Sequence, residues 1–149
     1  MRDVDAGLTT LQADPGTART ALSALQLAST SEYGAFYVDA EGRFTFQDRS
    51  VTASSVSGTP TEFNDDGTDI AYSNAVWVLN DTLIYNEANV TRAGGSVQTA
   101  SDAASIAKYF LHSYNQQGLL MQTDAEALEY AQAYVASRQE TTVRCDALT

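Results

Sequence analysis

Three parts of the sequence carry residue types that could perform chemistry: the single histidine His112, the single cysteine Cys145, and the acidic run Asn64–Asp69. A catalytic histidine needs a nucleophile or a carboxylate held against it, and no nearby residue in the sequence supplies one. His112 lies near the end of a predicted helix, which favours a structural or surface role. Cys145 alternates with Val143 and Ala147, which favours a small buried apolar residue over a nucleophile.

The run Asn64–Asp69 is the best candidate for a metal site, because Ca²⁺ prefers hard oxygen ligands around a glycine turn. The twelve-residue calcium loop and its closing glutamate are absent, so a plain turn is favoured and a cation site is the alternative. Gly94-Gly95 lacks the following Lys-Ser/Thr of a phosphate loop. We therefore predict no catalytic, cofactor-binding or metal-binding residues and no enzymatic activity.

Aromatic residues are the other candidates for function. Trp77 and the eight tyrosines could form a binding surface, since such rings combine apolar area with a polar group. Most of them lie at strand or helix periodicity, so packing accounts for the majority. Asn80-Asp81-Thr82 and Asn89-Val90-Thr91 match the glycosylation sequon, but we expect no export signal and hence no modification.

Length and charge exclude several classes of protein. The chain has 149 residues, with 8 Lys and Arg against 19 Asp and Glu, and a net charge of −11. One domain over residues 1–149 is expected, and the acidic balance predicts no direct affinity for nucleic acid. A single cysteine excludes an internal disulfide, and no apolar run approaches the roughly 18 residues of a membrane span.

A first helix is predicted over residues 15–29. Asp14 is a favoured N-cap, and Pro15 suits the first helical position because its missing amide would have no partner there. Leu22 and Leu25 recur at helical spacing among alanines, so this stripe is expected to face the core. The polar run that follows is expected to end the helix.

A second helix is predicted over residues 102–113. Asp102 offers an N-cap at its start. Ile106, Tyr109 and Phe110 form an apolar stripe, in which Ile106 and Tyr109 are expected to anchor the helix on the sheet.

A third helix is predicted over residues 124–138. Thr123 and Glu126 have the spacing of a capping box, which opens such a helix. The apolar residues on one face are Ala127, Tyr130, Ala131, Tyr134 and Val135.

Two hairpins are predicted from β-rich runs. Ala35–Val38 and Arg43–Phe46 are joined by a short loop in which Gly42 supplies a positive φ. Val76–Leu79 and Thr82–Val90 make a second plausible hairpin, in which the later strand is apolar enough to be covered on both faces.

The remaining segments complete the predicted fold. Ser96–Thr99 is expected to add a short strand, and Thr141–Leu148 reads as a terminal strand. A long polar connection is expected at about residues 50–70, with one short strand near Thr61–Phe63. The fold class is therefore α+β, with a mixed or mainly antiparallel sheet packed with about three helices.

One stretch is more specific than composition. Residues 84–106 read IYNEANVTRAGGSVQTASDAASI: an asparagine-centred strand, a Gly-Gly turn, and then D-x-x-S-I-x-x-Y opening a helix. The last pattern is carried by Asp102, Ser105, Ile106 and Tyr109. The stretch resembles the phage minor tail proteins of the tail-tip or tail-hub type, which occur in siphoviruses of actinobacteria and in related prophages.

Two further stretches are similar to the same family. Residues 32–46 match its hairpin pattern E-x-G-x-f-y-v-D-x-x-G-x-l-x-f, and Asp124–Leu128 followed by Ala131 resembles its penultimate helix. Together the matches span roughly residues 3–149 in the family's order.

The chain departs from the family pattern in two places. The family usually has Gly-Arg after the tyrosine, where this chain has Phe110-Leu111. A proline often precedes the terminal strand, where this chain has Glu140-Thr141-Thr142. Family members are usually longer, so the chain resembles one segment of a hub protein or a shortened member.

The resemblance implies a virion structural component of the phage tail, made in the host cytoplasm. Its partners would be copies of itself and other tail proteins, and no catalytic residues are implied. Asn86 is unusual in a strand, so its amide is expected to bond to a neighbouring loop, with an inter-subunit bond as the alternative. The acidic charge would suit a tail channel, because passing DNA would be repelled.

Two other functions stay open at this stage. One is a host-surface carbohydrate- or receptor-binding module of the tail tip, in which Trp77 and exposed tyrosines stack on sugars. Burial of Trp77 would count against it. The other is a small cell-wall hydrolase, which would need a pair of carboxylates or a histidine converging in a cleft.

Overall fold

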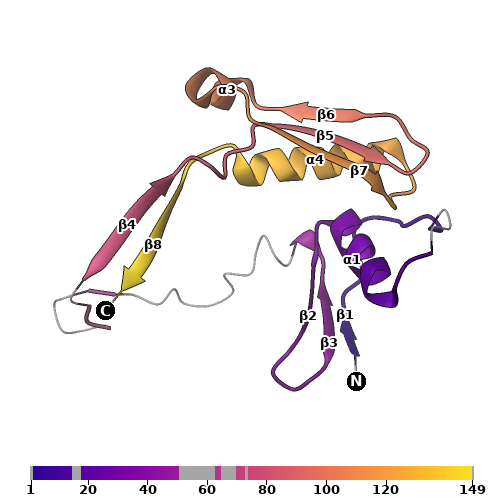
Figure 1. Cartoon of the computed structure of the whole chain (residues 1–149), viewed down its shortest axis with the longest axis horizontal. Helices are drawn as coiled ribbons and strands as arrows, with labels where there is room; N and C mark the ends of the chain where they lie inside the picture. Colours follow the sequence, from indigo (N-terminus) through magenta and orange to yellow (C-terminus); the bar gives the residue numbers. More distant parts are fainter. Residues whose placement is uncertain (1, 15–17, 51–62, 65–69, 73, 149) are drawn as a thin grey trace.

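The computed structural model describes residues 2–14, 18–50, 63–64, 70–72 and 74–148, apart from the side chains of residues 2–3 and 143–148. Within these residues the fold is α+β, with three helices and three small sheets (Figure 1). One sheet and one helix form an N-terminal unit, and a second sheet with two helices forms a C-terminal unit. A two-stranded ribbon extends away from both.

The N-terminal unit is a three-stranded sheet with a helix against it. In the order β1-β3-β2, β1 is parallel and β2 antiparallel to β3. Its elements are β1 (Arg2–Val4), α1 (Ala21–Glu32), β2 (Ala35–Val38) and β3 (Phe44–Gln47). Gly42 has a φ of 75° between β2 and β3, and the Asp39 carboxylate accepts a hydrogen bond from the Arg43 amide. The first predicted hairpin is confirmed.

The C-terminal unit holds the core. Its elements are β5 (Glu87–Arg92), β6 (Gln98–Ser101), α3 (Ala103–Tyr109), β7 (Ser113–Leu119) and α4 (Asp124–Arg138). The sheet order is β6-β5-β7, with β7 parallel to β5. The buried core cluster between this sheet and α4 consists of Ala88, Val90, Leu119, Met121, Ala127, Tyr130, Ala131, Tyr134 and Val135. The predicted third helix, its capping box and its apolar face are therefore confirmed.

The ribbon consists of β4 (Ala75–Asn80) and β8 (Thr142–Leu148). They run antiparallel with Asn80 opposite Thr142, and the register shifts between Val76 and Trp77. Figure 1 shows the ribbon leaving the body beside the C-terminal end of α4. The predicted terminal strand is confirmed, and its partner is β4.

The prediction for the first helix is wrong at both ends. Residues 18–20 are not helical, and Thr20 is the N-cap, since its side chain accepts a hydrogen bond from the Ser23 amide. Asp14 instead pairs with Arg19 at 2.8 Å. Pro15 lies outside the described residues. The polar run expected to end the helix is its buried last turn, because tertiary hydrogen bonds satisfy those side chains.

Two of these tertiary bonds connect the helix to other parts of the chain. Ser31 Oγ accepts a hydrogen bond from the Leu120 amide at 2.8 Å. The Glu32 carboxylate accepts hydrogen bonds from the Leu8 and Thr9 amides at 2.8 and 2.7 Å. The last turn of α1 therefore holds both the segment after β1 and the end of β7.

The second predicted hairpin does not form. β4 pairs with β8, and β5 lies between β6 and β7. The Asn80 side chain accepts a hydrogen bond from the Thr82 amide, and the Ile84 amide bonds to the Asp81 carbonyl. These local turns send the chain back into the body, where Ile84 is buried, and they do not reverse it alongside β4. The short strand expected at Ser96–Thr99 is β6, which lies two residues later.

The second predicted helix is too long. Asp102 is its N-cap, as predicted, but α3 ends at Tyr109, and β7 begins at Ser113. Most of the polar connection at 50–70 lies outside the described residues, and so do two residues of its expected strand. Phe63 does form an isolated parallel bridge with Ile70.

Candidate functional site

A buried asparagine fixes the turn between α3 and β7. Asn86 lies just before β5 and has no exposed surface. Its Nδ2 donates to the Phe110 carbonyl at 2.6 Å, and its Oδ1 accepts from the His112 amide at 2.8 Å. Nδ2 also lies 3.3 Å from the buried Ser105 hydroxyl. The prediction that this amide bonds to a neighbouring loop is confirmed.

The turn held in this way presents two apolar side chains to solvent. Phe110 is 84% exposed and Leu111 is 57% exposed. The prediction that Phe110 belongs to the apolar stripe of the second helix is therefore wrong. Phe110 has φ 65° and ψ 177°, a region that is essentially restricted to glycine. We call residues 110–112 the Phe110 turn.

The positive φ also bears on the sequence. Glycine adopts such a φ without steric cost, but this sequence has a large aromatic residue at the position and so gives no local signal of the turn. Helical periodicity concealed it, because Phe110 continues the stripe of Ile106 and Tyr109.

An apolar groove lies between α1 and its sheet. We call it the α1 groove and define it by Val4, Leu11, Leu25, Ala28, Phe36 and Phe46. Its volume is about 300 Å³, and Asp5 and Glu32 also contribute to its wall. Leu22 and Leu25 are both about half exposed, so the expectation that this stripe faces the core is wrong. The helix covers only part of the apolar sheet face.

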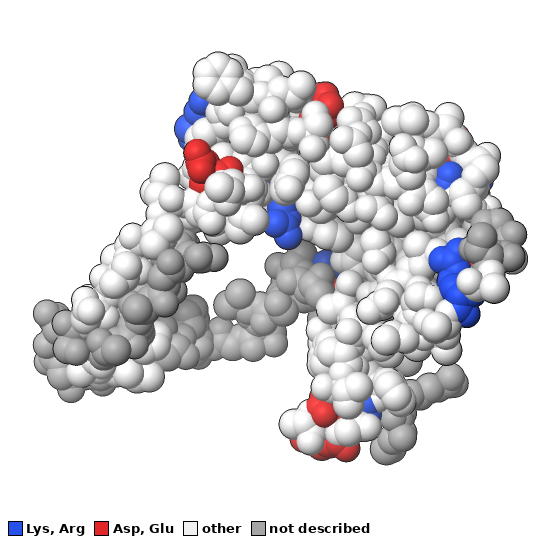
Figure 2. All heavy atoms as spheres, viewed as in Figure 1, with Lys and Arg blue, Asp and Glu red and all other residues white. Residues whose placement is uncertain are grey.

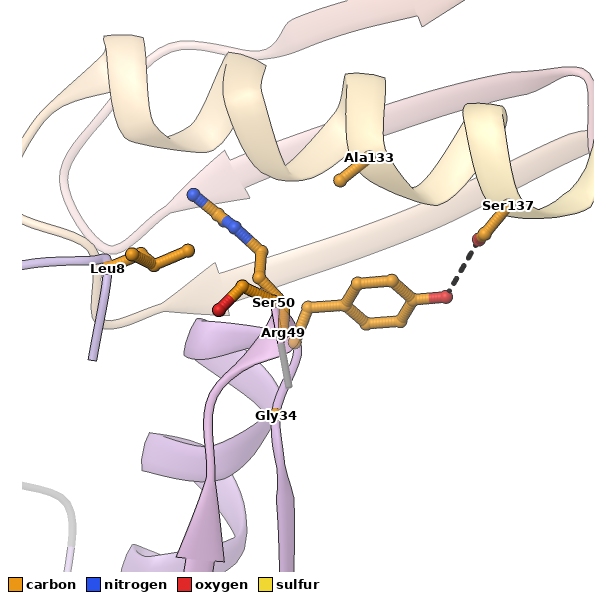
Figure 3. Close-up of a pocket in the computed structure, with 7 residues that line it drawn as sticks. Leu8, Gly34, Arg49, Ser50, Ala133 and Ser137 are labelled. Carbon is orange, nitrogen blue, oxygen red and sulfur yellow. Dashed lines mark hydrogen bonds between the residues drawn. The ribbon is translucent and has the colours of Figure 1, made fainter. Parts of the chain in front are cut away.

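A second pocket lies where the N-terminal unit meets α4. Figure 3 shows Arg49 beside Leu8, with Ala133 and Ser137 of α4 across the pocket. The volume is about 580 Å³, and the Tyr33 hydroxyl lies 3.0 Å from Ser137 Oγ. Among the described lining residues there is no histidine, cysteine or carboxylate. This lining offers no base to activate a nucleophile.

Five tyrosines pack together next to this pocket: Tyr33, Tyr85, Tyr114, Tyr130 and Tyr134. The rings of Tyr114 and Tyr134 stack with centroids 3.9 Å apart. Burial raises the pKa of Tyr134 to about 12 and raises the pKa of Tyr130 further. These hydroxyls stay protonated at neutral pH, so the cluster acts in packing and hydrogen bonding.

The residues singled out for chemistry are not brought together. His112 Nε2 lies 3.0 Å from the Tyr109 carbonyl at the end of α3. The Cys145 side chain and residues 65–69 of the acidic run lie outside the described part. In the rest of the chain, no group of three or more His, Cys, Asp or Glu side chains is placed to hold a metal ion.

The Gly94-Gly95 turn holds an ion pair. Arg92 Nε lies 2.6 Å from Asp124 Oδ1, and Ser96 Oγ donates to Asp124 Oδ2 at 2.7 Å. The hydrogen bond from Ser96, followed by that from Arg92, lowers the pKa of Asp124. A Cβ at Gly95 would lie 2.4 Å from both Arg92 Cγ and Asp124 Oδ1, so the pair requires glycine here.

Trp77 is exposed on the ribbon. Its exposed fraction is 67%, and that of Leu79, two residues along β4, is 71%. Within the described residues the ring–ring contacts involve tyrosines and phenylalanines, and Trp77 is not in an aromatic cluster.

Comparison with known proteins gives no assignment: no family model matches the chain, and no curated protein matches it significantly. None of the described helices has the length and apolar character needed to cross a membrane.

Proposed function

We propose that this chain is a structural component of a phage tail, of the minor tail or tail-hub type. In this role it acts in the virion by associating with copies of itself and with other tail proteins. This role requires no catalytic centre, and its specificity lies in the surfaces that contact those partners.

The placement of the family-like residues supports the proposal. The stretch 84–106 folds as one unit, in which β5, the Gly-Gly turn, β6 and the start of α3 are continuous. Asp102 caps α3 by accepting a hydrogen bond from the Ser105 amide at 2.6 Å. Ser105 in turn is buried and contacts Asn86. The residues that carry the resemblance therefore have structural roles at the centre of this unit.

The observation that carries the proposal is the amount of apolar side chain left exposed in three separate places. These are the Phe110 turn, the β4–β8 ribbon with Trp77 and Leu79, and the exposed face of α1 with Leu22 and Leu25. Exposed apolar patches on a soluble domain usually mark contacts with other proteins. Figure 2 shows that most of one face is uncharged, with acidic side chains at the β2–β3 turn and near α3.

The location in the virion is directly testable. Antibodies against the chain, applied to particles of the phage or induced prophage that encodes it, should label the end of the tail in electron micrographs. An antibody against the major capsid protein is the control. Absence of label from intact particles, with the chain present in the lysate, would contradict the proposal.

A host-surface carbohydrate-binding module is the second candidate, and the exposure of Trp77 is the observation in its favour. In that case purified chain should bind cell-wall polysaccharide of the host, and Trp77→Ala should abolish binding. Leu79→Ala is the matched control, because it removes an equally exposed side chain of the same strand without removing a ring.

A further inference from the structure

The segment that follows β1 lies between the two units and bonds to both of them; we call residues 8–12 the strap. Its first two amides, those of Leu8 and Thr9, donate to the Glu32 carboxylate of α1 at 2.8 and 2.7 Å. The next amide, that of Thr10, donates to Glu126 Oε1 of α4 at 2.8 Å. Three consecutive amides are therefore divided between two carboxylates, one from each unit.

The rest of the strap pairs with the chain that follows β7. Leu11 forms an isolated antiparallel bridge with Met121, and the Gln12 amide donates to the Leu120 carbonyl at 2.8 Å. The Gln12 side chain also donates to the Ala93 carbonyl at 2.8 Å. Even a complete two-stranded pairing is only marginally stable by itself in water. The hold on the strap therefore depends on the two carboxylates as well as on this bridge.

Both carboxylates are held by uncharged donors. Glu32 is only 2% exposed, and the two strap amides bond to its two oxygens. Glu126 uses its second oxygen to accept from the Thr123 amide and hydroxyl, both at 2.9 Å. An ionised carboxylate is an acceptor only, whereas a protonated one carries an O–H donor that would face the amide donors of the strap. The strap is thus matched to the ionised form of both side chains.

The charged residues around these carboxylates do not take the place of the strap. They are Asp5 in the α1 groove, the Arg92–Asp124 pair at the start of α4, and the Arg49–Glu129 pair beside the pocket that Leu8 lines. Asp5 has the same charge as Glu32, and the described lining of that groove has no lysine or arginine. Both arginines pair with other carboxylates of α4. Loss of charge on Glu32 or Glu126 therefore acts directly on the strap.

We infer that residues 8–12 form an acid-sensitive strap, which joins the two units while Glu32 and Glu126 are ionised and is released when these side chains take up protons. The bond from the Leu120 amide to Ser31 Oγ does not involve the strap, so the units stay connected after release. The device is independent of the proposed function, because it concerns a conformational change within one chain.

Release of the strap would open two hollows of the surface together. Thr9 and Leu11 line the α1 groove. Leu8 lines the pocket beside α4, where Figure 3 shows its side chain next to Arg49. The strap is therefore a wall that the groove and the pocket share, and acid would remove it from both.

Hydrogen exchange of single amides, followed by nuclear magnetic resonance on the full chain, tests the strap at neutral pH. Glu32→Gln places an amide group where one strap amide needs an acceptor. The protection of the Leu8, Thr9 and Thr10 amides should then fall at least tenfold more than that of the β5 amides, because the strap opens by itself. An equal fall in the strap and in β5 would mean general destabilisation and would overturn the inference. So would a fall confined to Leu8 and Thr9, because the strap would then not open as a unit.

Two matched variants separate the carboxylates from packing and capping. Thr9→Val keeps the amide and removes a buried hydroxyl that has no hydrogen-bond partner among the described residues, so the strap should stay at least as protected. Thr123→Ala weakens the cap of α4 but keeps Glu126, so Glu126→Gln should reduce the protection of the Thr10 amide at least tenfold more. Release of the strap by Thr9→Val, or equal effects of Thr123→Ala and Glu126→Gln, would contradict the role of the carboxylates.

Acid provides the direct measurement. In the unmodified chain, a change from neutral pH to about pH 3, below the ordinary range of glutamate, should remove the protection of the strap while β5 stays protected. The double variant Glu32→Gln/Glu126→Gln should show the same low protection of the strap at both pH values. A strap that stays protected in acid, or one that loses protection only together with β5, would refute the inference, and neither result would bear on the proposed function.

Discussion

The backbone of Phe110 leads to an unusual prediction: glycine should be better than alanine at this position. With φ 65° and ψ 177°, any side chain costs on the order of 1–3 kcal/mol in strain. Glycine removes that strain, but it costs about 0.4–1 kcal/mol through the entropy of the unfolded chain. We therefore expect Phe110→Gly to be more stable than Phe110→Ala by about 1 kcal/mol.

The comparison with alanine isolates the backbone effect. Both variants lose the same ring, which is 84% exposed and makes few packing contacts. The loss of packing energy is therefore the same in the two variants and cancels in the comparison. Leu111 provides the matched control in the same turn, because its φ is not positive. Among the described non-glycine residues, only Tyr33 and Phe110 have a positive φ. At Leu111 the order should reverse, with alanine more stable than glycine by about 0.4–1 kcal/mol.

Urea unfolding followed by circular dichroism measures the difference. With a denaturant slope of about 2 kcal/mol per M, a difference of about 1 kcal/mol moves the midpoint by about 0.5 M. The measurement is made at one low protein concentration, because self-association would itself add apparent stability. If Phe110→Ala proves at least as stable as Phe110→Gly, the argument from backbone strain is refuted.

Three further predictions concern the parts that support this turn and the sheet. Asn86→Ala should lower the free energy of unfolding by about 2–4 kcal/mol, because it leaves the Phe110 carbonyl and the His112 amide unpaired. As the control, Asn89→Ala on the partly exposed face should change the free energy of unfolding by no more than about 1 kcal/mol. Gly95→Ala should cost about 1–3 kcal/mol in thermal or urea unfolding, because its Cβ would overlap Arg92 and Asp124. Burial opposes ionisation of Glu126, but hydrogen bonds from the Thr10 and Thr123 amides hold its pKa below the usual 4.5. The ionised side chain therefore stabilises the fold above pH 4.5. This stabilisation is lost as the pH falls through the lower pKa of the folded state. Glu126→Gln should therefore flatten this acid dependence in a pH series of urea midpoints, and an unchanged pH profile would contradict the assignment.

Local signals in the sequence predicted the elements that depend on local chemistry. The Thr123–Glu126 capping box, the Asp102 N-cap and the positive φ of Gly42 each involve residues within a few positions of one another. The α+β class followed from the same kind of pattern, and so did the finding that no helix of the described residues is long and apolar enough to cross a membrane. These features need no knowledge of distant parts of the chain.

Features that depend on distant residues were not predictable in this way. The composition of β4 predicts a strand but does not indicate which strand it pairs with. Its partner, β8, lies far along the chain and is identified only by the structure. β7 is mostly polar, so its composition does not predict a strand. The residues just before it continue the helical pattern of α3 in the sequence. The helix ends there because the side chain of Asn86, 26 positions earlier than His112, accepts a hydrogen bond from the His112 amide. The α1 groove was hidden because helical spacing marks an apolar stripe as buried, whether or not another element covers it.

The pairing of β4 with β8 has a consequence for how the chain matures. Because β4 leaves the ribosome long before β8, its Val-Trp-Val-Leu segment has no native partner while the intervening residues are synthesised. Closing so large a loop is slow compared with forming a local turn, so the ribbon is expected to be completed late. During that interval an unpaired apolar strand can combine with the same strand of another nascent chain. The order of the strands therefore predicts that aggregation during synthesis would begin at this segment.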